Sequence, residues 1–290
     1  MSASGFKPFE TLAIVGLGLI GGSFAKDVRR LGLAQRIIGY ENNPEYHTEI
    51  SNRELVDYLS AEPDAKLAEA ELVLLAVPVK ALSQVLSQIR PFLSASAIVT
   101  DVGSVKSPLV KIMISPEYSD IRFVGGHPIA GSEHFGPGAA QVNLFAGKRF
   151  ILTPSENTDP KLISIVSALW KSLGAEVSEM DADSHDKMFA SVSHLPHLLA
   201  YASIQAIANS ETPDALKHSG AGLKDFSRIA SSSPEMWADI FLENQDNLLK
   251  RMKTFTAAMT ELEDAMQKND KEKLIELLTQ AKKERDRWMT

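Results

Sequence analysis

Histidine is the side chain best suited to moving a proton near neutral pH, and this sequence contains seven. His127 stands out because it directly follows residues 122–126, a segment predicted to be a buried strand. In doubly wound folds, ligands bind at the carboxyl edge of the sheet. An imidazole at that edge can take a proton from a hydroxyl group while the attached carbon gives up hydride. His127 is therefore a candidate general base, and a turn histidine bonded to backbone is the alternative.

Two further histidines, His194 and His197, lie three residues apart at the start of a predicted helix. This spacing could suit a metal ion, but a third ligand is not evident. We therefore favour a helix start at Pro196 with both imidazoles hydrogen-bonded, and we expect no metal. The four remaining histidines have polar neighbours and are predicted to be solvated surface residues: His47, His134, His185 and His218.

Arg228 is the arginine of a polar segment, residues 220–228, between predicted helices. Its planar guanidinium could bind a carboxylate through two parallel hydrogen bonds. A plain surface salt bridge is the alternative. The chain has no cysteine, which excludes disulfides, thiolate metal sites and a cysteine nucleophile.

Three glycines separate a predicted strand, residues 12–15, from a predicted helix, residues 19–31. Gly16 would allow the sharp turn, Gly18 would let backbone approach a pyrophosphate, and Gly21 would let helix and strand pack closely. The helix N-terminus would face the phosphates. Leu19 and Ile20 begin this helix and belong to the same candidate site. A glycine turn in an ordinary α/β domain is the alternative interpretation.

Glu41 strengthens the dinucleotide interpretation because it ends a second predicted strand, residues 36–40, about twenty residues after Gly21. An acidic residue at this place binds the hydroxyls of the adenosine ribose. Its charge would repel a 2′-phosphate, and Asn42 and Asn43 supply no arginine to bind one. The predicted cofactor is therefore NAD rather than NADP.

Strand and helix patterns alternate up to residue 180. This alternation predicts a Rossmann-type, doubly wound, mostly parallel sheet with both faces covered. Val77 and Pro78 end one of the apolar strands and should lie beside the cofactor. A loop over residues 127–138 is rich in glycine, proline and polar groups, and such loops carry function. Predicted strands are residues 12–15, 36–40, 71–77, 97–101, 122–126, 149–152 and 175–180, and the helices between them are 19–31, 45–57, 80–89, a short one after 108, and 161–173.

Beyond residue 181 only helical spacing is found. We therefore predict a dinucleotide-binding domain over 1–180 and an all-α domain over 181–290. The second domain contains a narrow apolar stripe, which we call the seam, and it either packs within one subunit or forms a homodimer interface. The seam consists of Leu248, Met252, Phe255, Met259, Leu262 and Met266.

Composition limits the partners. The net charge of −7 argues against nucleic-acid binding, which needs clustered lysines and arginines. No apolar run is long enough to span a bilayer, and the first ten residues lack a signal-peptide pattern. We therefore expect no membrane partner and a cytoplasmic location. The expected partner is a small-molecule substrate.

Five motifs taken together go beyond general patterning. They are residues 15–23, 101–106, 126–133, 193–197 and 225–230. With these motifs in this order, the chain resembles the prephenate/arogenate dehydrogenase family of tyrosine biosynthesis, from about residue 11 to Trp237. Other dehydrogenases with a Rossmann and a helical domain would share only the first motif, and a non-catalytic NAD-binding regulator is the remoter alternative.

The resemblance implies oxidative decarboxylation of prephenate or arogenate, with hydride passed to NAD. It implies that His127 accepts the proton of the ring hydroxyl and that Ser104 links this histidine to the nicotinamide. Arg228 would bind the substrate carboxylate. The other implied substrate contacts are His197, which would line the pocket, Glu133 and Trp237, which would stand at its mouth, and Ser132 beside them. Prephenate with NAD is the expected pair.

Overall fold

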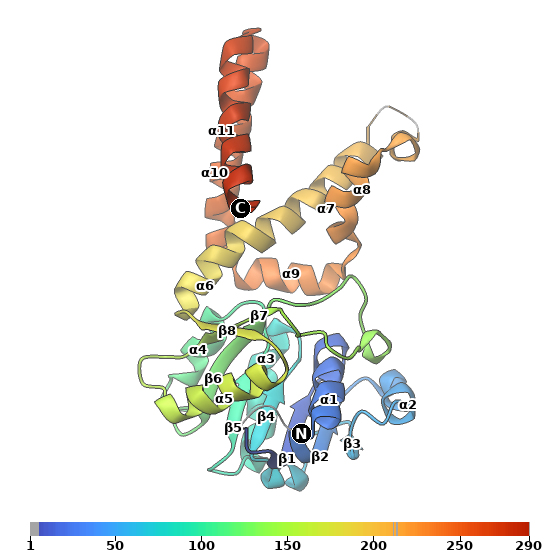
Figure 1. Ribbon diagram of the computed structural model, residues 1–290, viewed down its shortest axis with the longest axis vertical. Coiled ribbons are helices and arrows are strands. Elements are labelled where there is room, and N and C mark those ends of the chain that lie inside the picture. Colours follow the sequence, from blue (N-terminus) through green and yellow to red (C-terminus); the bar gives the residue numbers. More distant parts are fainter. Residues whose placement is uncertain (1–5, 211, 213, 290) are drawn as a thin grey trace.

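The computed structural model describes residues 6–210, 212 and 214–289. An eight-stranded sheet with the order β3-β2-β1-β4-β5-β6-β7-β8 forms the centre of the first part of the chain (Figure 1). All neighbouring strands are parallel except β6 and β7, which are antiparallel. The predicted mostly parallel sheet is confirmed. The strands are β1 (Phe9–Val15), β2 (Ala34–Tyr40), β3 (Tyr58–Ser60), β4 (Leu72–Leu75), β5 (Ile98–Asp101), β6 (Arg122–Pro128), β7 (Arg149–Thr153) and β8 (Glu176–Glu179).

Helices cover both faces of this sheet because the central strands are apolar on both sides. On one face Trp170 of α5 stacks on Phe150 of β7, with ring centroids 3.8 Å apart, and also contacts Phe24 of α1. On the other face Leu86 of α3 and Leu109 of α4 join a second core cluster. The helices are α1 (Leu19–Leu31), α2 (Pro44–Asn52), α3 (Leu82–Ile89), α4 (Ser107–Met113) and α5 (Pro160–Ser172).

Two strand boundaries differ from the predictions in ways that shape the site. β4 ends at Leu75, so Val77 and Pro78 lie in the turn that follows it. β6 continues to Pro128, because its last residues pair with β7, His127 lying opposite Ile151. His127 is thus the penultimate residue of a strand rather than the residue after one. The short β3 was not predicted, since three partly buried residues carry no clear periodicity.

After Glu179 the described chain is helical, as expected. α7 and α8 rise obliquely from the sheet, α9 lies between them and the sheet, and α10 and α11 form a hairpin that projects away (Figure 1). A π-helical turn, Ala190–His194, joins α6 to α7, and Pro196 lies in the first turn of α7, as the predicted helix start requires. The elements are α6 (Ala182–Phe189), α7 (Leu195–Ala208), α8 (Ala221–Ser227), α9 (Pro234–Glu243), α10 (Gln245–Gln267) and α11 (Lys271–Met289).

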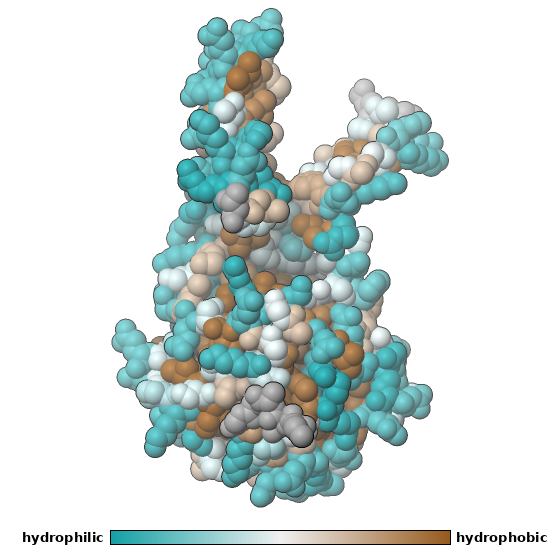
Figure 2. Space-filling view, in the orientation of Figure 1, coloured by the Kyte–Doolittle hydropathy of each residue, from teal (hydrophilic) through white to brown (hydrophobic). Residues whose placement is uncertain are grey.

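Most of the seam faces solvent in the single chain. Leu248 is buried, but Met252, Phe255, Met259 and Met266 are exposed along α10. Apolar side chains are visible on the projecting hairpin in Figure 2. Packing within one subunit therefore covers only part of the seam. None of the helices described is long and apolar enough to cross a membrane.

Candidate functional site

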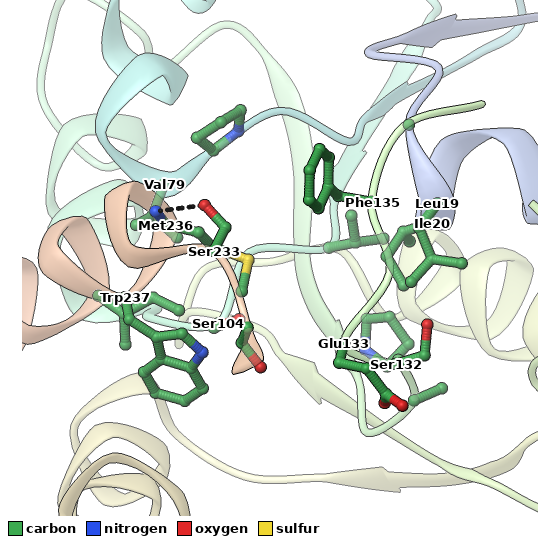
Figure 3. Close-up of a pocket in the computed structure, with 18 of the residues that line it drawn as sticks. Leu19, Ile20, Val79, Ser104, Ser132, Glu133, Phe135, Ser233, Met236 and Trp237 are labelled. Carbon is green, nitrogen blue, oxygen red and sulfur yellow. Dashed lines mark hydrogen bonds between the residues drawn. The ribbon is translucent and has the colours of Figure 1, made fainter. Parts of the chain in front are cut away.

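A cavity of about 580 Å³ lies between the carboxyl edge of the sheet and the helices α7 and α9. Figure 3 shows Ser233, Met236 and Trp237 on one side, Leu19, Ile20, Ser132, Glu133 and Phe135 on the other, and Ser104 between them. Most of the predicted site residues line this one cavity. They are Gly18, Leu19, Ile20, Val77, Pro78, Ser104, His127, Ser132, Glu133, His197, Arg228 and Trp237.

The glycine turn between β1 and α1 has the shape that a dinucleotide needs. A Cβ at Gly21 would lie 1.9 Å from the Gly16 carbonyl oxygen, so helix and turn meet too closely for a side chain. Gly16 has φ +91°, in the left-handed region. By contrast, a Cβ at Gly18 would meet nothing within 4 Å. Since no side chain caps α1, its first-turn amides stay available for an anion.

Glu41 lies beside this turn at the end of β2 and is not part of the cavity wall. Its carboxylate accepts hydrogen bonds from the amides of Leu17 (2.9 Å) and Asn43 (3.0 Å). The carboxylate therefore holds the glycine turn in place as well as presenting negative charge where a ribose would lie. The two remaining glycine-turn candidates, Gly16 and Gly21, also lie behind the cavity wall.

His127 is almost fully buried at the bottom of the cavity, with 9% of its surface exposed. Its Nδ1 lies 2.8 Å from Nε2 of His185, and the ring of Phe189 packs against it at 4.9 Å. Burial, followed by the neighbouring His185, Lys106 and His194, lowers the pKa of His127 well below its usual value. His127 is therefore neutral at pH 7, as a general base must be.

Lys106 is buried beneath His127, where its ammonium pairs with the carboxylate of Asp101. The ammonium also donates a hydrogen bond to the Gly126 carbonyl at 2.6 Å. Asp101 in turn accepts from the amides of Gly103 (2.8 Å) and Gly126 (3.1 Å). This arrangement ties the end of β5 to the strand that carries His127, and it leaves a fixed positive charge near the imidazole.

His197 and Trp237 form the helical wall of the cavity. Their rings stack with centroids 3.6 Å apart. Nδ1 of His197 donates to the Ser193 carbonyl at 2.8 Å, which leaves Nε2 as the atom available to a ligand. Trp237 is 7% exposed, so it lies deeper than the pocket mouth where we expected it. Its buried indole N–H has no hydrogen-bond partner among the described residues.

Arg228 lies at the open end of the cavity, with 63% of its side chain exposed. It faces Glu133 across the opening, at 3.4 Å. Glu133 and Ser132 belong to the loop after β6, and this loop is bound to α1 further along, where Asp27 accepts from the amide of Asn143 at 3.0 Å. The loop is thus held against α1.

Two histidine predictions are wrong. His185 is fully buried and bonded to His127, although its polar neighbours suggested a surface position. Those neighbours misled because Asp186 is itself buried, its carboxylate paired with backbone amides. The useful signal was the spacing of His185 and Phe189, four residues apart on one helix face. His47 is half-buried, with Nε2 at 2.6 Å from the Glu41 carbonyl.

The other expectations have mixed outcomes. His194 and His197 are both hydrogen-bonded, as we favoured, His194 through Nδ1 to the amide nitrogen of Asn244 (3.1 Å). Among the described residues, no group of histidines and carboxylates could hold a metal ion. Ser104 lines the cavity, but no described hydrogen bond joins it to His127. His134 is exposed at the cavity edge and His218 is exposed outside it.

Comparison with known proteins decides the family. Residues 24–179 match the family profile described as prephenate dehydrogenase, nucleotide-binding domain, and residues 181–280 match the profile for prephenate dehydrogenase, dimerization domain. The chain belongs to the prephenate dehydrogenase family. Membership also decides against the other dehydrogenases that share only the first motif.

Relatives in this family span nearly the whole chain. A cyclohexadienyl dehydrogenase from Zymomonas mobilis is 33% identical over 96% of this chain and 95% of its own. The crystal structure of prephenate dehydrogenase from A. aeolicus, in complex with hydroxyphenyl propionate and NAD+, is 38% identical, with a TM-score of 0.89, covering 97% of this chain and 99% of that one. Synechocystis arogenate dehydrogenase is 32% identical, with a TM-score of 0.78, covering 96% and 99%.

Proposed function

We propose that this chain is a NAD-dependent prephenate dehydrogenase, which converts prephenate to 4-hydroxyphenylpyruvate and carbon dioxide. One observation carries the proposal: a single cavity combines an open glycine turn, a buried neutral imidazole and an exposed guanidinium. These are a place for a dinucleotide, a base and a binding group for an anion. Family membership and the NAD+ bound in the A. aeolicus relative support it.

His127 serves as the general base in this reaction. It accepts the proton of the ring hydroxyl as the carbon that bears the hydroxyl loses hydride. The electron pair of the bond to the ring carboxylate then enters the ring, and carbon dioxide leaves. Formation of an aromatic ring makes the overall step favourable. A neutral imidazole is needed at the start, which agrees with the lowered pKa of His127.

Arg228 binds the substrate carboxylate through its guanidinium. In the described chain a guanidinium nitrogen of Arg228 lies 3.4 Å from a carboxylate oxygen of Glu133. This exposed ion pair is weak, and a substrate carboxylate can replace it. His197 and Trp237 line the ring-binding wall, while Ser132 and Glu133 close the cavity from the loop. Ser104 lines the same cavity and would link the base to a bound nicotinamide, as the family resemblance implies.

The glycine turn and the first turn of α1 would hold NAD, with Gly18 against the pyrophosphate and Glu41 at the adenosine ribose. Bound NAD supplies the hydride acceptor. The carboxylate of Glu41 disfavours NADP, because it would lie against the 2′-phosphate of that cofactor.

Arogenate is the second candidate substrate, since relatives of similar identity carry the names cyclohexadienyl dehydrogenase and arogenate dehydrogenase. The two substrates differ by a keto or an amino group on the side chain. The loop of residues 133–141, which passes over the cavity opening, is the segment we propose to discriminate between them.

The proposal is tested by following formation of the reduced nicotinamide by absorbance, with prephenate or arogenate and with NAD+ or NADP+. Prephenate with NAD+ should give the highest kcat/KM. The variant His127→Asn should lose about 10²–10⁴-fold or more in kcat with a small change in KM, because it lacks the base. NAD+ binding without turnover of either substrate would instead support a non-catalytic regulator, and unchanged turnover in the variant would remove His127 from the mechanism.

The assembly we propose is a homodimer formed through the helical part. The exposed seam on α10 supports it, as does the description of the matching family profile as a dimerization domain. The cytoplasmic location expected from the sequence stays a prediction.

A further inference from the structure

We propose that His185 and Asp186 form a positioning pair that holds His127 in the Nδ1–H tautomer, so that the Nε2 lone pair faces the cavity. The inference rests on the proposed function, in which His127 is the base. A histidine that carries its proton on the cavity-facing nitrogen could not accept one from a substrate hydroxyl. The tautomer of His127 therefore decides whether the site can work, and the two buried groups His185 and Asp186 determine it.

The chain of hydrogen bonds begins at Asp186. Its Oδ1 accepts from the amide of Lys106 and its Oδ2 from the amide of Ser107, both at 2.8 Å. A backbone N–H can only donate, so both oxygens of Asp186 act as acceptors and the carboxyl group is ionised. Burial would raise the pKa of Asp186, but the hydrogen bonds from His185 and these amides outweigh it, and the pKa is lowered.

His185 is the middle of the chain. Its Nδ1 lies 2.8 Å from Oδ1 of Asp186, so this nitrogen carries the proton and donates it. Burial lowers the pKa of His185, so the ring is neutral at pH 7. In a neutral imidazole only one nitrogen is protonated, which makes Nε2 of His185 an acceptor.

His127 ends the chain and faces the cavity. The acceptor at His185 Nε2 lies 2.8 Å from His127 Nδ1, so the His127 proton resides on Nδ1. Nε2 of His127 has no partner among the described residues and is left as a bare lone pair. The ring of Phe189 lies 4.9 Å from His127 and 4.4 Å from His185, which restricts both imidazoles to this geometry.

The same chain stabilises the imidazolium that forms during the reaction. After His127 takes the substrate proton, its Nδ1–H still donates to His185, which is polarised by the carboxylate of Asp186 behind it. A bond that strengthens when the charge appears lowers the barrier of the step. His185 and Asp186 thus act through His127 and contact neither substrate nor cofactor.

The tautomers can be read directly by NMR of the whole protein with 15N-labelled histidine. We expect both His127 and His185 to be protonated on Nδ1 at pH 7. In His185→Leu, which removes the acceptor, His127 should lose this fixed protonation and populate the Nε2–H form. If His127 carries its proton on Nε2 in the unaltered protein, or stays Nδ1–H in the leucine variant, the proposal is wrong.

Kinetics give an independent test with a matched pair of variants. His185→Leu should lower kcat by about 10²–10⁴-fold, comparable to the loss of tautomer control in serine proteases, with KM little changed. His185→Gln keeps an amide oxygen near the place of Nε2 and should recover part of that loss. His218→Gln, which removes an exposed histidine outside the cavity, should leave kcat unaltered.

The outcomes separate this proposal from the proposed function. Equal kcat for the leucine variant and the unaltered enzyme, or no gain from glutamine over leucine, would overturn the positioning role while leaving prephenate oxidation intact. Absence of turnover in the unaltered protein would overturn the function, and the NMR measurement would still decide the tautomer. Thermal melting and NAD+ affinity of each variant show whether the fold is retained.

Discussion

At the scale of single residues, the proposed reaction divides its work between a buried base, His127, and an exposed binding group, Arg228. His127 is kept neutral by burial and by the fixed charge of Lys106 nearby. Arg228 needs no such control, because guanidinium stays charged in any protein environment. A buried, neutral imidazole suits proton transfer from the substrate, whereas an exposed cation suits binding of an anionic substrate from water.

Replacement of Arg228 by alanine should therefore weaken substrate binding more than turnover. A charge-assisted hydrogen bond is worth about 1.5–3 kcal/mol, which predicts a rise in KM of roughly 10–100-fold. Arg228→Lys keeps the charge but loses the planar guanidinium. Its KM should therefore lie between that of the unaltered enzyme and that of the alanine variant. Steady-state kinetics with prephenate check this expectation. An unaltered KM in the alanine variant would show that another group binds the carboxylate.

At the scale of elements, the β1–α1 turn, which we propose to hold the cofactor, contains two glycines with opposite requirements. Gly21 is needed by the protein itself, since a side chain would strike the Gly16 carbonyl. A Cβ added at Gly18, by contrast, would meet no protein atom within 4 Å. The φ of Gly18, −72°, also lies outside the left-handed region that favours glycine. Only an approaching ligand would require glycine there.

Alanine variants of these glycines should consequently differ. Gly21→Ala should destabilise the fold by roughly 1–3 kcal/mol and lower the melting temperature, because the turn must shift. Gly18→Ala should melt like the unaltered protein and yet bind NAD+ more weakly. Calorimetric melting and NAD+ titration measure the two effects. Normal NAD+ affinity in Gly18→Ala would mean that the pyrophosphate does not approach this residue.

At the scale of the whole molecule, the projecting hairpin of α10 and α11 leaves apolar surface that one chain does not cover. Met252, Phe255 and Met259 share one face of α10 and are each more than a third exposed. An isolated hairpin with such a face gains stability by packing against another surface, and in the proposed homodimer a second copy of the chain would supply one.

A charge in the middle of this face should accordingly separate the subunits. Met259→Glu should shift the molar mass measured by light scattering from dimer towards monomer. Lys250→Glu changes a charge on the opposite, solvated face of the same helix and should leave the dimer intact. A dimer that survives Met259→Glu would place the interface elsewhere, and a monomeric unaltered protein would rule out the homodimer.

The sequence by itself determined the sheet, the glycine turn and the change to helices after residue 181, because local periodicity and glycine spacing carry that information. It also marked His127, Ser104 and Arg228, through motifs that lie far apart along the chain. Tertiary structure alone decided which of these residues share the cavity, how deep Trp237 lies, and that most of the seam is exposed.

The role of His185 is the clearest case of what the sequence could not provide. Polar neighbours suggest solvent exposure, but the amides of Lys106 and Ser107, about eighty residues away in the chain, satisfy Asp186 and allow both side chains to be buried. Burial of a polar group depends on partners brought together by the fold, and local sequence cannot name them. The hydrogen-bonded chain to His127 therefore became visible only in three dimensions.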